Sequence, residues 1–142
     1  MSLDTTAPMA PRTSSFAKTR LDHADETAED YVEAIDDLLT TAGTCRVKDL
    51  ACQMEVSHVT VTRILSRLET EGLVIREPYG PVELSRAGRR LARASRARHG
   101  LVLKFLLALG VPKGAADHDA EGMEHHVSEA TLKAMRKFLS QQ

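Results

Sequence analysis

The densest group of potential metal ligands is the run EGMEHH at residues 121–126. Residues at positions i, i+3 and i+4 project from one face of a helix. Glu121, Glu124 and His125 have this spacing, so a helix here would direct two carboxylates and an imidazole toward one metal ion. His126 would point about 100° away from His125 around the helix, and we assign it a supporting or structural role.

Further oxygen and nitrogen donors lie upstream. Asp30 and Glu33 are three residues apart in the segment 22–37, which holds eight acidic residues and no Lys or Arg, and His99 lies where a basic segment gives way to an apolar one. Four carboxylates and two imidazoles without a thiolate form a hard donor set that suits Mn²⁺ or Fe²⁺ better than a structural zinc ion. Such a set could hold two ions. Asp30 alone would equally fit a helix cap or a charge at the positive end of a helix.

A second group of residues is typical of DNA binding. A recognition helix needs an apolar face for anchoring and an opposite face of side chains that reach bases and phosphates. Val61, Ile64, Leu65 and Leu68 repeat at helical spacing and supply the apolar face. An ordinary amphipathic helix with a solvated face would fit this segment equally well. The candidate DNA contacts are Ser57, His58, Thr60, Thr62, Arg63 and Arg67 in the helix, and Arg76 in a wing that follows it.

The order of the expected elements favours DNA binding. Thr27 is expected to cap the first helix and Ser57 the third. The preceding residues 1–26, rich in Pro, Ser and Thr, are expected to be disordered or loosely attached. We predict a mainly α protein with an N-terminal winged helix-turn-helix, a small two-stranded wing and a C-terminal helical region. Periodicity, caps and breaks predict helices over 27–41, 47–54, 58–71, 86–109, 115–128 and 129–141, with strands 73–76 and 81–84.

Charge is unevenly distributed along the 142 residues, although the formal net charge is only −1. Residues 46–98 hold eleven Lys or Arg against six Asp or Glu, an excess that suits DNA contact. Six of these arginines, within 86–98, are interpreted as a solvated face rather than a second DNA surface. Cys45 and Cys52 match neither a CxxC pair nor a usual zinc motif and are expected to be reduced structural thiols. We find no secretory or membrane-spanning segment and expect a cytoplasmic protein.

The metal-ligand motif also supports a family resemblance. The stretch 119–128, with Asp30-Tyr31-Val32-Glu33 and Arg98-His99 upstream, resembles the manganese transport regulators of the diphtheria-toxin-repressor superfamily. The resemblance covers about residues 27–140 and implies a homodimer formed by the C-terminal helices, without the SH3-like domain of longer members. It implies that the ligands of a dinuclear metal site are Asp30, Glu33, His99, Glu121, Glu124 and His125.

Two positions depart from the family pattern. Val59 stands where members often have a proline near the start of the recognition helix, and Gly100 stands where they often have a polar residue after the ligand histidine. These departures bear on the operator sequence and on the geometry of the metal site.

The resemblance implies a manganese-dependent repressor that binds operator DNA as a homodimer, with two Mn²⁺ per subunit and Fe²⁺ as an alternative. We expect residues 27–86 to form the DNA-binding domain and residues 87–142 the dimerisation and metal-binding domain. No membrane association and no small organic substrate are expected.

Three other interpretations were considered. The nearest is an iron- or zinc-responsive repressor of the same fold. A metallohydrolase could use the same donors, but the sequence has no His-Glu-x-x-His helix, no Gly-rich phosphate loop and no nucleophile elbow. The third is a metal-independent winged-helix repressor that binds a small organic effector.

Overall fold

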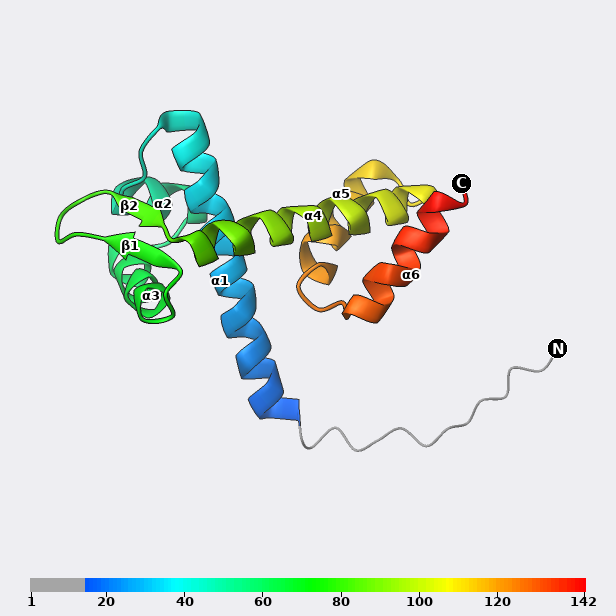
Figure 1. Ribbon diagram of the computed structural model, residues 1–142, viewed down its shortest axis with the longest axis horizontal. Coiled ribbons are helices and arrows are strands. Elements are labelled where there is room, and N and C mark those ends of the chain that lie inside the picture. Colours follow the sequence, from blue (N-terminus) through cyan, green and yellow to red (C-terminus); the bar gives the residue numbers. More distant parts are fainter. Residues whose placement is uncertain (1–14) are drawn as a thin grey trace.

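The computed structural model describes residues 15–142, with side chains from residue 23 onward. A winged helix-turn-helix lies at one end and a group of short helices at the other, and the long helix α4 runs between them (Figure 1). No helix of the described residues is both long and apolar enough to cross a bilayer. The elements are α1 (Ser15–Ala42), α2 (Val47–Met54), α3 (His58–Thr70), β1 (Val74–Arg76), β2 (Val82–Leu84), α4 (Arg86–Ala108), α5 (Lys113–Met123) and α6 (Glu129–Ser140).

The first helix begins at Ser15, so the predicted start near Thr27 is wrong. Thr27 lies within α1, and its hydroxyl donates to the carbonyl of His23 at 2.9 Å instead of capping the helix. A Thr hydroxyl can bond to the preceding turn of a helix as well as cap a helix start, so the residue type alone did not fix the boundary. Of the segment 1–26 that was expected to be loosely attached, residues 1–14 lie outside the described part of the chain.

The helix-turn-helix is confirmed closely. Asp49 accepts from the backbone N–H of Arg46 at 3.0 Å, which closes the start of α2. Ser57 caps α3 as predicted, since its side chain accepts from the backbone N–H of Thr60 at 3.1 Å. The wing is an antiparallel pair in which Val74 faces Leu84. The sequence signals worked here because local caps and a short turn define each boundary.

Helix α4 is shared by two hydrophobic cores. Its first half packs in the core of α1, α2, α3 and the wing through the buried Ala92, and its second half packs against α5 and α6 through Val102 and Leu106. Cys45 belongs to the first core and is fully buried, which raises the pKa of its thiol to about 11. The two ends of the molecule are therefore joined by one continuous helix.

The predicted helix over 115–128 is too long. Helix α5 ends at Met123, and Glu124, His125 and His126 form a turn before Ser128 caps α6 by accepting from the N–H of Thr131 at 3.2 Å. Glu124 still follows the helical path, because its N–H bonds to the carbonyl of Ala120 at 3.0 Å, whereas His125 lies beyond the helix and not on its face as expected. Ser128 begins a new helix, and the chain must leave α5 before it to change direction.

Candidate metal centre

A cleft of about 970 Å³ lies between the two halves of the molecule. Its walls come from α1, α2, α4, α5 and the turn that follows α5. Among the described residues that line it are Asp30, Glu33, His99, Glu121 and Glu124, five of the six predicted metal ligands. Residues more than sixty positions apart in the sequence thus face one space.

Three carboxylates form the inner part of this site. Asp30 and Glu33 of α1 and Glu124 of the turn each offer an oxygen, and these atoms lie within 4.8 Å of one another. Glu124 is 3% exposed. Glu33 Oε1 is buried and has no hydrogen-bond partner. A buried carboxylate oxygen without a partner is costly, and a divalent cation would satisfy it, so these residues fit a metal ion.

His99 and Glu121 lie beside this inner group. His99 Nδ1 lies 2.6 Å from Glu124 Oε2, so the imidazole of α4 contacts the carboxylate of the turn directly. Glu121 is exposed on α5 and lines the cleft, but it does not belong to the groups whose ligand atoms lie within 4.8 Å. Glu121 is therefore near the site without completing it in this conformation.

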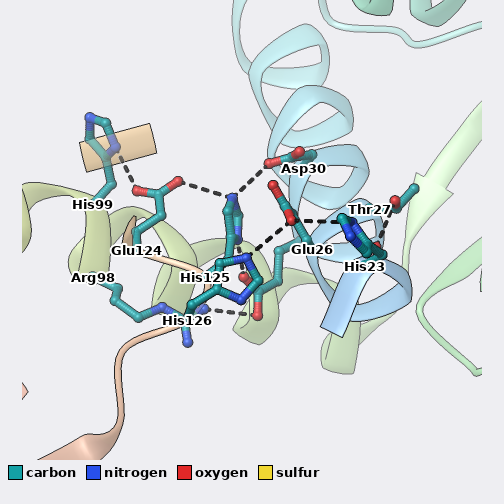
Figure 2. A network of polar contacts seen from close by, with 10 residues as sticks. His23, Glu26, Thr27, Asp30, Arg98, His99, Glu124, His125 and His126 are labelled. Atoms are coloured by element: carbon teal, nitrogen blue, oxygen red, sulfur yellow. Dashed lines mark hydrogen bonds and ion pairs between the residues drawn. The ribbon is translucent and has the colours of Figure 1, made fainter. Parts of the chain in front are cut away.

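His125 is the most enclosed imidazole of the centre, with a side chain 3% exposed. Its Nδ1 lies 2.5 Å from Glu29 Oε2, and its Nε2 lies 3.1 Å from Asp30 Oδ1 and 3.4 Å from Glu124 Oε1 (Figure 2). Burial lowers the pKa of His125, but the bond to Glu29 and the charges of the neighbouring carboxylates outweigh burial, so the pKa is raised overall. Metal binding at Nε2 needs this nitrogen without a proton, so a raised pKa of His125 opposes metal binding at low pH.

Burial also raises the pKa values of the two carboxyl groups that face His125. For Asp30, other acidic residues of α1 raise the pKa further while His125 lowers it. For Glu124, burial outweighs the lowering effects of His99 and His125. Burial thus disfavours the ionised forms of these carboxyl groups, and a divalent cation bound beside them would favour the ionised forms instead.

Two acidic residues that the sequence analysis did not select complete the surroundings. Glu29 accepts from His125 and also pairs with Arg98 of α4, whose Nη2 lies 2.9 Å from Glu29 Oε1. Glu26 Oε2 lies 3.3 Å from His126 Nε2, and both side chains are seen in Figure 2. The available signal was their position in the acidic segment, one turn or less from Asp30, but the first helix was predicted to start after Glu26.

Two of the six arginines of α4 bind the acidic helix, and the interpretation as a solvated face is wrong for these two. The other four are exposed as expected: Arg86, Arg89, Arg90 and Arg93. Arg96 Nη1 lies 2.5 Å from Asp36 Oδ2, and Nη2 contacts Asp37. With Arg98 bound to Glu29, α1 and α4 are held together on both sides of the cleft. These contacts position the carboxylates of α1 opposite the turn that carries Glu124.

The predicted DNA contacts fall into two groups. The residues that lie exposed are Ser57, His58, Thr62 and Arg63, and Thr60 is half-buried beside them. Arg67 is half-buried and contacts α1, since its Nη2 donates to the carbonyl of Ala24 at 3.0 Å. Arg76 Nε donates to Glu69 Oε1 at 2.5 Å. Arg67 and Arg76 thus support the position of α3, and Arg63 is the predicted arginine contact that remains fully exposed on α3.

Comparison with protein families divides the chain into two parts just before α4 begins. Residues 23–82 match the N-terminal DNA binding domain of iron-dependent repressors, and residues 85–141 match the metal binding and dimerisation domain of the same proteins. Together the two matches cover most of the chain.

Individual relatives belong to the same class of protein as the family matches. Transcriptional regulator MntR of Escherichia coli O6:H1 is 48% identical over 123 residues, which are 87% of this chain and 79% of the relative. The MntR of Salmonella typhimurium is 44% identical over 126 residues, which are 89% of this chain and 80% of the relative. Both relatives are transcriptional regulators.

Solved structures show the same arrangement. A manganese-dependent transcriptional repressor in complex with manganese is 32% identical, with a TM-score of 0.67, and the match covers 80% of this chain and 52% of that one. The chain spans about half the length of this solved structure and of the manganese regulator SloR, of which it covers 53%. By its two domain matches and its relatives, this chain belongs to the iron-dependent repressor family.

Proposed function

We propose that this chain is a manganese-dependent transcriptional repressor that binds operator DNA as a homodimer when divalent metal occupies the centre between its two halves. The observation that carries the proposal is the meeting of Asp30 and Glu33, on the helix that opens the DNA-binding half, with Glu124 and His125 of the C-terminal half. The manganese-regulator relatives support Mn²⁺ as the activating ion.

The ligand set proposed for this centre is Asp30, Glu33, His99, Glu121, Glu124 and His125. A bound divalent cation supplies positive charge that cancels the repulsion among these carboxylates. Hard oxygen donors with imidazole fit Mn²⁺, and the same donors accept Fe²⁺, so the iron-responsive alternative differs only in the ion. Comparing the affinities of the purified protein for Mn²⁺, Fe²⁺ and Zn²⁺ at one pH decides between them.

We also propose the predicted domain division, with residues 27–86 for DNA binding and residues 87–142 for dimerisation and metal binding. The two family matches support it, because they divide between residues 82 and 85. The exposed residues of α3 are proposed to contact the operator, with Arg63 as the principal basic contact. A transcriptional regulator acts on chromosomal DNA, so we place the protein in the cytoplasm.

Metal control of DNA binding follows from where the ligands lie. Without a shared ion the carboxylates of Asp30, Glu33 and Glu124 repel one another, and the recognition helices of a dimer sample many relative orientations. When Asp30, Glu33 and Glu124 bind one centre, the recognition helices hold a separation near one turn of B-DNA, about 34 Å. Operator binding then costs less conformational entropy, so bound metal raises the affinity for the operator. By thermodynamic linkage, bound operator raises the affinity for the metal by the same factor.

The enzyme alternative has no support. The relatives are transcriptional regulators, and the family consists of DNA-binding repressors. The donors of the cleft therefore serve a regulatory site, and we set the metallohydrolase aside.

The test is DNA binding with and without metal. Duplex fragments from the promoter regions of the protein's own genome are titrated with the dimer in Mn²⁺ and in a chelator, and we expect retarded complexes in Mn²⁺ only. Arg63→Ala should keep metal binding and lose DNA binding, whereas Glu124→Ala should keep the dimer and lose the metal response. Equal DNA affinity in Mn²⁺ and in the chelator would contradict the proposal.

A further inference from the structure

We propose that Glu26 is an additional metal ligand, which holds an outer ion together with Asp30 and His125. The inference rests on the proposed function, because it assigns a residue to the same metal centre. It adds a carboxylate outside the six-residue ligand set, and it identifies where the second of two ions would lie.

The geometry groups Glu26 with two of the proposed ligands. Glu26, Asp30 and His125 each offer a ligand atom, and these atoms lie within 4.8 Å of one another. Asp30 also belongs to the inner group with Glu33 and Glu124. A carboxylate has two oxygens, so Asp30 can bridge two ions at the separation of about 3.5–4 Å that is usual in two-metal sites.

Helix geometry explains why Glu26 faces the same space. Glu26 precedes Asp30 by four residues and Glu33 by seven, so the three carboxylates follow one face of α1. Glu26 also lines the cleft with the inner ligands. Figure 2 shows Glu26 and Asp30 on neighbouring turns of α1, facing His125 and His126. The part of α1 that precedes Thr27 thus supplies a donor to the centre.

Glu26 is held in place by a histidine. His126 Nε2 lies 3.3 Å from Glu26 Oε2, and His23 Nδ1 lies 4.0 Å from the same oxygen. Outer histidines that bond to a ligating carboxylate orient it toward the metal. His126 is therefore a positioning residue, which gives the second histidine of the EGMEHH run a definite part. A surface ion pair between Glu26 and His126 without any metal would contribute little to stability.

The donors define the chemistry of the outer ion. Two carboxylate oxygens and one imidazole nitrogen leave room for water on an ion that prefers six ligands, and this mixture suits Mn²⁺. Asp30 belongs to both groups and the His125 side chain is 3% exposed, so the outer position is more open than the inner one through Glu26, whose side chain is 29% exposed against 4% for Glu124. We expect the outer ion to bind second and more weakly.

Replacement of Glu26 by Gln tests this assignment in the full-length protein. Calorimetric titration with Mn²⁺ should show two ions in the wild type, and Glu26→Gln should weaken the second by roughly tenfold or more while the first keeps its affinity. Electron paramagnetic resonance should show a spin-coupled pair of Mn²⁺ ions in the wild type and an isolated ion in the variant. Asp25→Asn is the matched control, because it removes one charge from an exposed neighbour on the same helix.

The outcomes separate this inference from the proposed function. If Glu26→Gln and the wild type bind two Mn²⁺ with equal affinities, or if the wild type binds one ion only, Glu26 is not an outer ligand and the metal switch itself stands. If Asp25→Asn weakens the second ion as much as Glu26→Gln, the effect is general charge and the inference fails. A wild type that binds no Mn²⁺ would overturn both.

Discussion

At the residue scale, Glu124 shows how the centre couples stability to function. Its carboxylate is almost fully buried between His99 and His125. Burial of a charge is costly unless partners compensate it. We therefore expect Glu124→Gln, which keeps the side-chain volume, to leave the Tm of the metal-free protein unchanged or higher. Its Mn²⁺ affinity should fall by roughly tenfold or more, as measured by calorimetry.

Asp119→Asn is the control for this variant, since it removes an exposed carboxylate from the same helix end. It should leave both the Tm and the Mn²⁺ affinity unchanged. If metal-free Glu124→Gln melts well below the metal-free wild type, the carboxylate stabilises the fold. If Glu124→Gln binds Mn²⁺ as tightly as the wild type, Glu124 is not a metal ligand.

The pKa values of the centre predict how metal stabilisation depends on pH. The pKa values of Asp30, Glu124 and His125 are all raised. The folded metal-free chain therefore keeps protons at pH values where the unfolded chain releases them, and these bound protons stabilise the fold. This contribution to the free energy of unfolding is lost as the pH rises through the raised pKa values, which for His125 means above 6.5. Metal binding needs the deprotonated groups. The increase in Tm caused by a fixed Mn²⁺ concentration should therefore be larger at about pH 8 than at about pH 6.

Differential scanning calorimetry at the two pH values measures this difference. The same scans in Mg²⁺ serve as the control for general ionic effects. A Tm increase that is equal at both pH values, or larger at the acidic one, would mean that the raised groups do not release their protons to the metal.

At the scale of elements, sequence patterns located the helices whose ends carry local signals. Ser57 caps α3 as predicted, and α6 begins at Glu129 as predicted, although its cap Ser128 had been placed in the preceding helix. The start of α1 and the end of α5 were misjudged, because Thr27 bonds within its own helix and the chain turns before Ser128. A Thr hydroxyl bonds inside a helix as readily as it caps one, and helical spacing alone does not show where a helix ends.

The same limit applies to the candidate site. Asp30, Glu33 and Glu124 were selected from spacing and resemblance, and the structure brings them together. Glu26 and Glu29 were not selected, because their contacts with His126 and His125 span about a hundred residues of sequence and no local pattern encodes them. Helical spacing selected Glu121, Glu124 and His125 as candidate donors, and the structure places Glu124 and His125 in the turn that follows α5.

The junction between the wing and α4 gives a prediction at this scale. A Cβ added at Gly88 would lie 2.1 Å from the carbonyl oxygen of Leu73, whose position is fixed because it accepts from Ser85 N–H at 3.0 Å. Gly88→Ala must therefore displace backbone, and we expect it to lower the free energy of unfolding by about 1–3 kcal/mol. Urea denaturation measures the change.

Gly114→Ala is the matched control, since a Cβ at this exposed position of α5 meets nothing within 4 Å. It should stabilise the protein by up to about 1 kcal/mol. If Gly88→Ala proved as stable as the wild type, the close packing of α4 against the wing would be wrong.

At the scale of the whole molecule, α4 and the metal centre form two separate connections between the cores. The helix is continuous, while the centre joins α1 to the turn after α5 across the cleft. Arg67 extends this connection to the recognition helix, because it donates to the carbonyl of Ala24, two residues from Glu26. Metal at the centre should therefore reduce the motion of α1, which Arg67 of α3 contacts.

Hydrogen exchange can follow this connection along the chain. Mn²⁺ should slow amide exchange in α1 around residues 26–33 and in the turn 124–128, because the ligands of both segments become fixed together. The wing strands, which lie away from the cleft, serve as the internal control. Slowing confined to one of the two segments would mean that the metal does not join the halves.

The central claim is that one metal centre takes ligands from both halves of the chain. Anomalous diffraction at the manganese edge from crystals grown with Mn²⁺ tests it most directly. We predict a peak that contacts Asp30 or Glu33 of α1 and also Glu124 or His125 of the turn. A peak bound by residues of one half alone, or no peak in the cleft of a Mn²⁺-loaded protein, would contradict it.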